Sequence, residues 1–176
     1  ADAEGAAEAD DAEESSDAAD APAEQLGDEA VSAVAETSLS SYARVYVQKQ
    51  KDQNSSYATA EGVYHAGDKL YANMYDGTSN WSVKSVANSG DWTYTWFAGS
   101  SKTNNVSDYT EVVGTEQELT VAEAMAGKYL ICKVTAGGKD YYGPATTYNT
   151  GLNANYIPGP VLAAGQAKLY KVTLDK

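Results

Sequence analysis

Two residues in this 176-residue sequence could act as a nucleophile or a general base, and each type occurs once. His65 lies in the segment Tyr64-His65-Ala66-Gly67, and Cys132 lies in an apolar run far along the chain. A catalytic nucleophile needs a base and an orienting group within hydrogen-bond reach, and zinc needs several nitrogen or sulfur ligands. We interpret His65 as a loop histidine and Cys132 as a small buried hydrophobic residue. The sequence therefore predicts no catalytic residue, no metal site and no cofactor.

Carboxylates are the third kind of group that could do chemistry, because a facing pair of them is what a glycosidase needs. Beyond the N-terminal segment, the acidic residues that could contribute stand singly: Asp68, Asp76, Asp91, Asp108, Glu111, Glu116, Glu118 and Glu123. No spacing marks two of them as facing each other, and no calcium-loop pattern occurs. We therefore predict that the protein is not an enzyme, and a hydrolase built from scattered acids is the weakest alternative.

The net charge of −13 is concentrated near the N-terminus. Residues 1–36 contain 13 of the 25 acidic residues and neither lysine nor arginine, so the rest of the chain, with 12 acidic and 12 basic residues, is neutral. A neutral domain gives no electrostatic attraction for nucleic acid or anionic lipid. No apolar run reaches the roughly 18 residues of a membrane-spanning helix. We expect neither nucleic-acid binding nor direct insertion into a membrane.

Residues 1–38 alternate alanine with aspartate and glutamate. Ordering about 38 residues costs roughly 1–2 kcal/mol for each residue. The aliphatic side chains that could offset this cost are Leu26, Val31 and Val34, and each contributes only about 1.5–3 kcal/mol when buried. The segment is therefore predicted to be a disordered acidic leader.

From Tyr42 onward, apolar residues recur at every second position, which is the pattern of strands buried on one face. The segments with this pattern are 42–48, 69–75, 91–97, 118–121, 129–135 and 140–148. Turns are predicted at Asp76-Gly77 and Gly137-Gly138, and a brief helical turn over 122–126. Short strands separated by such turns predict an all-β antiparallel sandwich or barrel. Its structural core is predicted to include Trp96, Leu70, Leu130, Cys132 and Val134.

The aromatic residues are the one feature that could support binding, since exposed tyrosine and tryptophan stack on sugar rings and anchor protein interfaces. Tyr42, Tyr46, Tyr71 and Tyr75 share strand faces with polar side chains, so we expect these faces to be exposed. If the first two strands share a sheet, the four tyrosines would form an outer aromatic patch. Trp81, in a predicted loop, is the best single candidate for a ligand-facing aromatic. The alternative is cross-strand tyrosine pairing, which stabilises a sheet by about 0.2–1 kcal/mol for each pair without any ligand.

Two segments, 91–97 with the sequence DWTYTWF and 118–129 with the sequence ELTVAEAMAGKY, resemble bacterial immunoglobulin-like repeats of secreted and cell-surface proteins. In such repeats a strand ending in Tyr-x-Trp supplies the core tryptophan, here Trp96. A Gly-Lys-Tyr segment supplies the turn into the penultimate strand, here Gly127 and Tyr129. The resemblance covers roughly 67–148. It implies an immunoglobulin-like antiparallel β-sandwich and provides no catalytic residues.

The predicted organisation is a leader over 1–38, an immunoglobulin-like sandwich over 39–157, and a C-terminal linker with an extra strand over 158–176. Residues 167–170 match residues 43–46 in type at all four positions, so 158–176 is alternatively the first strand of a second repeat. We favour the extra strand, because an unpaired apolar strand promotes aggregation.

These features together predict a non-catalytic structural or adhesive module, a spacer or stalk of an extracellular or cell-surface bacterial protein from which a signal peptide has been removed. The alternative is a carbohydrate- or protein-binding module that uses the exposed tryptophan and tyrosines. A surface glycan, or a host or bacterial protein, is the partner that this alternative implies.

Overall fold

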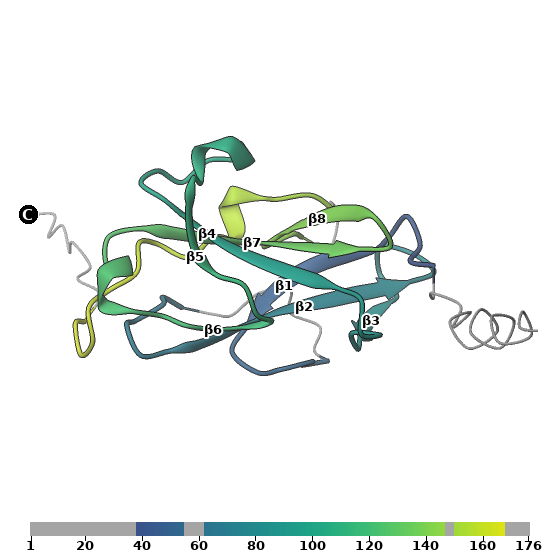
Figure 1. Ribbon diagram of the computed structural model, residues 1–176, viewed down its shortest axis with the longest axis horizontal. Coiled ribbons are helices and arrows are strands. Elements are labelled where there is room, and N and C mark those ends of the chain that lie inside the picture. The colour runs from purple at the N-terminus through teal and green to yellow at the C-terminus, as the bar shows by residue number, and fades with distance from the viewer. Residues whose placement is uncertain (1–37, 55–61, 147–149, 168–176) are drawn as a thin grey trace, which may run out of the picture. The chain divides into compact units, whose positions relative to one another are not determined.

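Residues 38–54, 62–146 and 150–167 are described in the computed structural model of the chain (Figure 1). All of these residues belong to one compact unit of the chain, which spans Thr37–Lys176. The predicted leader over 1–38 lies outside the described residues except for Ser38, and so does the C-terminal stretch 168–176.

Two antiparallel sheets of four strands each contain the strands of the described residues. In the first sheet, β2 (Lys69–Gly77) pairs on one side with β1 (Arg44–Gln48), and on the other side with β3 (Val83–Val86) and β6 (Glu118–Thr120). In the second sheet the strand order is β5 (Glu111–Gly114), β4 (Thr93–Gly99), β7 (Tyr129–Ala136) and β8 (Lys139–Gly143).

The helical segments of the described residues are short 3₁₀ turns, η1 (Val106–Asp108), η2 (Glu123–Met125) and η3 (Ala154–Tyr156). The predicted all-β class with antiparallel sheets is therefore confirmed. The immunoglobulin-like topology stays a prediction.

The main hydrophobic core lies between the two sheets and takes alternate residues from each strand. Leu70 comes from β2, Trp96 from β4, and Leu130, Cys132 and Val134 from β7, and all five are buried. The predicted core residues thus lie together, because the period-two pattern directs one side of every strand to the same interior. Burial of apolar area is the main stabilising contribution to such a sandwich.

The outer face of the first sheet is also covered, which the sequence did not predict. All five residues of β1 are buried, including Arg44, Tyr46 and Gln48, whose face was expected to be exposed. Backbone from other segments covers this face: the Thr146 carbonyl accepts from Arg44, and the Gln50 carbonyl accepts from a neighbouring asparagine. The polar side chains of β1 are therefore satisfied by protein groups in place of water.

The outer face of the second sheet carries a second covering layer. Ile131 of β7 is fully buried in a cluster with Tyr109, Ala154 and Ile157. The last two belong to the η3 region, which returns across this sheet after β8. Ile131 alternates with the core residues Leu130 and Cys132 along β7, so it points away from the main core. The returning segment explains why an apolar residue stands on this face.

Several element boundaries differ from the predicted ones. β3 and β5 were not predicted, and β2 continues through Asp76-Gly77, where a turn was expected. β8 ends at Gly143, before Pro144, which lacks the N–H group that a strand ladder needs. Gly127 has a φ of +83° and precedes Tyr129, the first residue of β7, as the predicted turn requires.

Candidate functional site

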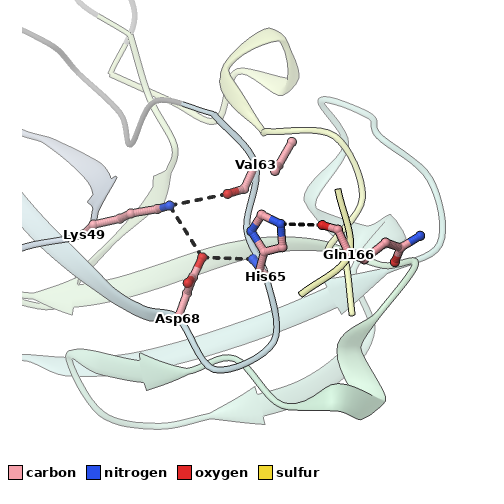
Figure 2. Close-up of polar contacts among 5 residues, drawn as sticks. All are labelled: Lys49, Val63, His65, Asp68 and Gln166. Atoms are coloured by element: carbon pink, nitrogen blue, oxygen red, sulfur yellow. Dashed lines mark hydrogen bonds and ion pairs between the residues drawn. The ribbon is translucent and has the colours of Figure 1, made fainter. Parts of the chain in front are cut away.

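His65, the one histidine of the chain, lies at the end of the first sheet, just before β2. Its ring Nε2 lies 2.8 Å from the backbone carbonyl oxygen of Gln166 (Figure 2). A carbonyl oxygen only accepts hydrogen bonds, so Nε2 carries the proton in this contact. The imidazole therefore binds the C-terminal segment of the described chain.

The backbone around His65 is fixed by Asp68. The His65 N–H donates to Oδ2 of Asp68 at 2.9 Å, and the Asp68 N–H donates to the His65 carbonyl at 3.0 Å. Lys49 extends between Oδ2 of Asp68, at 3.5 Å, and the carbonyl of Val63, at 3.4 Å (Figure 2). Both charged side chains are partly exposed, so their attraction is screened by water and contributes little stability.

The C-terminal segment that His65 holds is also fixed by its backbone. Leu162 forms a parallel bridge with His65, donates to the Tyr64 carbonyl and accepts from the Ala66 N–H, both at 2.8 Å. Val161 exchanges hydrogen bonds with Gly127 and Lys128, at 2.8 and 2.9 Å. Val161 and Leu162 thus join two segments that lie far apart in the sequence.

Cys132 has no solvent exposure and belongs to the main core. Burial raises the pKa of its thiol well above the ordinary value, because a thiolate in an apolar interior lacks solvation. The thiol is therefore protonated at neutral pH. No contact of the described residues joins it to His65.

The structure places the predicted binding aromatics in different environments. Trp81 is 71% exposed in the connection between β2 and β3. Tyr42 and Tyr71 are half-buried, whereas Tyr46 and Tyr75 are only 3% and 0% exposed. The expectation of an outer patch of four exposed tyrosines is therefore wrong.

Tyr46 and Tyr75 do lie on one face, as the pairing of their strands requires. Their ring centroids are 4.5 Å apart with an interplanar angle of 41°. Together with Ala145 they form a small buried cluster beneath the covering segments. These two tyrosines thus contribute packing in the way that the alternative interpretation described.

A polar hollow that the sequence did not predict lies along the edge of β2, between the ends of β3 and β6. There, Ala72 donates its N–H to the carbonyl of Gln117 in the connection that leads to β6. The hollow has a volume of about 320 Å³. Its lining consists of residues 116–118 together with Lys51, Tyr71, Asn88 and Tyr94. We refer to it below as the β2-edge hollow.

Asn73, which is fully buried, holds the walls of the β2-edge hollow in place. Its Nδ2 donates to Oε1 of Gln48 and to the carbonyl of Gln50, both at 2.8 Å. Its Oδ1 accepts from the Asp52 N–H at 2.9 Å and from Nε2 of Gln117 at 3.3 Å. All donor and acceptor positions of the amide are used. The residues around Lys51 and Gln117 are therefore positioned before any ligand arrives.

Glu118 lies at one side of this hollow in a three-residue network. Tyr71 donates its hydroxyl to Oε2 at 2.7 Å, and Nζ of Lys69 lies 2.9 Å from Oε1. The hydrogen bond from Tyr71, followed by that from Lys69, lowers the pKa of the Glu118 carboxyl. The same bond raises the pKa of the Tyr71 phenol.

Tyr94 contributes a phenol from β4, on the second sheet. Burial raises its pKa to about 12, partly offset by a hydrogen bond with Asn88. At neutral pH the hollow therefore presents two neutral phenols, amides, and charged groups of both signs. No signal along the sequence could have identified it, because its residues come from distant segments.

Within the described ranges, no three His, Cys, Asp or Glu side chains gather as a metal ion would require. Among the same residues, no helix has the length and apolar character needed to cross a bilayer. Comparisons of the chain with protein-family models, with curated proteins and with solved structures found no match.

Proposed function

We propose that this domain is a non-catalytic structural or adhesive module of a secreted or cell-surface protein, an immunoglobulin-like spacer that carries load between its two ends. The observation that supports this proposal is where the chain enters and leaves the sandwich. Ser40 donates its N–H to Oδ2 of Asp76, at 2.9 Å, and its hydroxyl to the carbonyl of Gly77, at 3.0 Å. Leu162 is bound beside His65, beyond the opposite end of β2.

These two attachment points are separated by the length of β2. The strand has nine residues, which corresponds to about 30 Å at the usual rise per residue. Figure 1 shows the first described residues and the yellow C-terminal segment at opposite ends of the sandwich. A spacer needs its entry and exit points at opposite ends.

The direction of β1 means that a force applied at the N-terminal side of the domain acts along the axis of this strand. Arg44 pairs with Tyr75 and Gln48 with Tyr71, so β1 runs from the Ser40 end toward the Leu162 end. Hydrogen bonds of an antiparallel pair are perpendicular to the strands. A pull along β1 therefore loads its hydrogen bonds to β2 together, and the bond from the Ala145 N–H to the Val45 carbonyl with them.

The contacts of His65 and Cys132 support this proposal. The ring of His65 binds the Gln166 carbonyl, and the thiol of Cys132 is enclosed in the core. Both arrangements favour a structural role for the domain.

Single-molecule force spectroscopy tests the load-bearing role. The domain is stretched between handles at its N- and C-termini, and the unfolding force is recorded. The matched control uses a handle at the N-terminus and a second at an exposed position beside Ser40, introduced as Thr78→Cys. In the control geometry the β1–β2 hydrogen bonds break one after another.

We expect a clearly higher unfolding force when the domain is pulled between its termini than when it is pulled between the N-terminus and position 78. Pulling between the termini loads the β1–β2 hydrogen bonds all at once, whereas the control geometry loads them one after another. Equal forces in the two geometries would contradict the proposal. The buried Cys132 does not compete for the handle chemistry in the folded domain.

Exposure of Trp81 favours a second candidate function, a carbohydrate- or protein-binding module. The side chain is 71% exposed, while its loop is held by a hydrogen bond from Arg44 to Asn80 at 2.7 Å. A tryptophan side chain has only two torsions, so it loses little conformational entropy on binding. A glycan array and a pull-down with surface proteins test this candidate.

Binding that disappears in Trp81→Ala but survives in Val112→Ala would support the second candidate. Val112 is a suitable control because it is also apolar and is 56% exposed. Equal binding by both variants would reject Trp81 as the anchor.

A further inference from the structure

We propose that the β2-edge hollow is a binding site for a neutral sugar unit, presented as a free saccharide or as the end of a glycan. This inference goes beyond the load-bearing role and does not depend on it. It also differs from binding through Trp81, which does not line the hollow.

The size of the hollow limits the ligand. A volume of about 320 Å³ is near the lower limit of small-molecule pockets, which are roughly 300–1,000 Å³. It suits a mono- or disaccharide and excludes a folded protein segment. Its walls come from both sheets, since Tyr71 belongs to β2 and Tyr94 to β4.

The charges around the hollow favour a neutral ligand. Lys51 and Glu116 have opposite charges, and both are exposed in the lining. Glu118 is compensated by Lys69 at 2.9 Å. An anionic or cationic ligand would meet a charge of its own sign as well as the opposite one, whereas a polyhydroxyl ligand can donate to the carboxylates and accept from the lysine.

The remaining lining groups match the chemistry of a sugar. Gln117 offers its amide oxygen as an acceptor, because its Nε2 donates to Asp52 and Asn73. Asn88 offers its amide nitrogen as a donor, because its Oδ1 accepts from the N–H groups of Gly90 and Trp92. Together the two amides supply one acceptor and one donor for the hydroxyls of a sugar ring.

Tyr71, which is half-buried, supplies aromatic surface for the apolar C–H face of the ring. Tyr94 is only 7% exposed and belongs to the main core, so it closes the inner side of the hollow.

A network of hydrogen bonds around the buried Asn73 supports the site. Asn73 bonds to the Asp52 N–H and to Gln117, and Nε2 of Gln117 also donates to Oδ1 of Asp52 at 3.0 Å. Polar groups fixed in advance reduce the ordering cost of binding.

The experiment is a titration of the folded chain followed by two-dimensional ¹H–¹⁵N NMR and by calorimetry. The neutral probes are the methyl glycosides of glucose, galactose, mannose and N-acetylglucosamine. Glucuronate and glucosamine serve as the anionic and cationic probes. We expect saturable shifts with at least one neutral probe, at the amides of 116–118, Tyr71 and Asn88, with a dissociation constant in the millimolar range.

Two exposed lining residues of opposite charge serve as test variants, Lys51→Ala and Glu116→Ala. Each is expected to weaken binding of the neutral probe about tenfold, the effect of losing one hydrogen bond that involves a charged group. Trp81→Ala is the control and is expected to bind with unchanged affinity. Far- and near-UV circular dichroism confirms that each variant is folded.

Three results would overturn the proposal: no saturable shift with any neutral probe, tighter binding of glucuronate or glucosamine, or shifts confined to the Trp81 loop and lost in Trp81→Ala. None of these results bears on the unfolding force. The sugar-binding proposal can therefore fail while the load-bearing proposal stands.

Discussion

The guanidinium of Arg44 donates a 2.7 Å hydrogen bond from Nη2 to Oδ1 of Asn80, and this bond links β1 to the loop that carries Trp81. Arg44 also donates to the carbonyls of Thr146 and Tyr42, both at 2.8 Å. Arg44 has no solvent exposure, so these oxygens replace the water that would otherwise surround its charge. The loop, β1 and the segment after β8 are thereby joined at one buried cation.

Replacement of Asn80 by alanine removes one acceptor from a buried charged donor. We expect Asn80→Ala to lower the free energy of unfolding by about 1–3 kcal/mol, the usual cost of leaving such a group unsatisfied. Urea denaturation followed by tryptophan fluorescence measures the change. Thr78→Ala, in the same loop but exposed, is the control and should change stability by less than about 0.5 kcal/mol. If Asn80→Ala and Thr78→Ala had the same free energy of unfolding, the Arg44–Asn80 hydrogen bond would contribute nothing to stability.

Gly143 is required because β1 lies directly against it. A Cβ at this position would come within 2.7 Å of Cγ1 of Val45 and would also overlap the Val45 carbonyl. We expect Gly143→Ala to destabilise the fold by about 1–3 kcal/mol or more, the cost of overpacking a rigid contact. Gly159→Ala is the matched control, because nothing lies within 4 Å of the added Cβ. Thermal denaturation of both variants checks the difference, and equal melting temperatures would contradict it.

The pKa of Glu118 predicts a pH dependence. Its folded-state pKa is lowered from the ordinary 4.5 by Tyr71 and then by Lys69. A group with a depressed folded-state pKa stabilises the fold above its unfolded-state pKa, and that contribution is lost as the pH falls through the folded-state value. The stability difference between wild type and Glu118→Gln should therefore be largest near neutral pH and shrink below pH 4.5. Chemical denaturation at several pH values tests this, and a difference independent of pH would refute it.

Burial of Cys132 predicts that its thiol is inert in the folded protein. The pKa of the thiol is raised by burial, so a thiol-specific reagent such as dithionitrobenzoate should react only after unfolding. The expected result is negligible reaction in buffer and complete reaction in guanidinium chloride. Ser89→Cys, an exposed position combined with Cys132→Ala, should react at once under native conditions. Rapid reaction of Cys132 in the native protein would show that the core opens on the timescale of the assay.

The interior of the sandwich could be predicted from the sequence because its signal is local. Leu130, Cys132 and Val134 alternate with other residues in one short strand, and that alternation alone places them on one face. Trp96 follows in the same way from its own strand. Each strand carries this information within a few residues.

The covering of the outer faces could not be predicted, because the covering residues lie elsewhere in the chain. The alternation in β1 indicates two faces, and it does not indicate whether the polar face meets water or protein. Tyr75 donates its hydroxyl to the Gln53 carbonyl, and Ile131 packs against Ile157. Both contacts depend on where a connection returns across a sheet. β3 and β5 were missed for a different reason, since neither VKSV nor EVVG alternates apolar with polar residues.

The β2-edge hollow shows the same limit for a candidate site. Lys51, Asn88 and Gln117 stand far apart in the sequence, and none belongs to a recognisable motif. Only the pairing of β2 with two different strands on one edge brings them together. Trp81, in contrast, could be identified as exposed because the surrounding loop residues are themselves polar.

The position of Val161 and Leu162 has a consequence for biosynthesis. Ribosomes deliver the chain from its N-terminus, so Tyr64–Ala66 and Gly127–Lys128 emerge long before the residues that satisfy their backbone groups. Until Leu162 leaves the ribosome exit tunnel, these edges remain open to pairing with any other nascent strand. The hydrogen bonds of Val161 and Leu162 therefore form only after the earlier strands have been synthesised, and a polypeptide truncated before residue 161 would keep unpaired backbone groups at both edges.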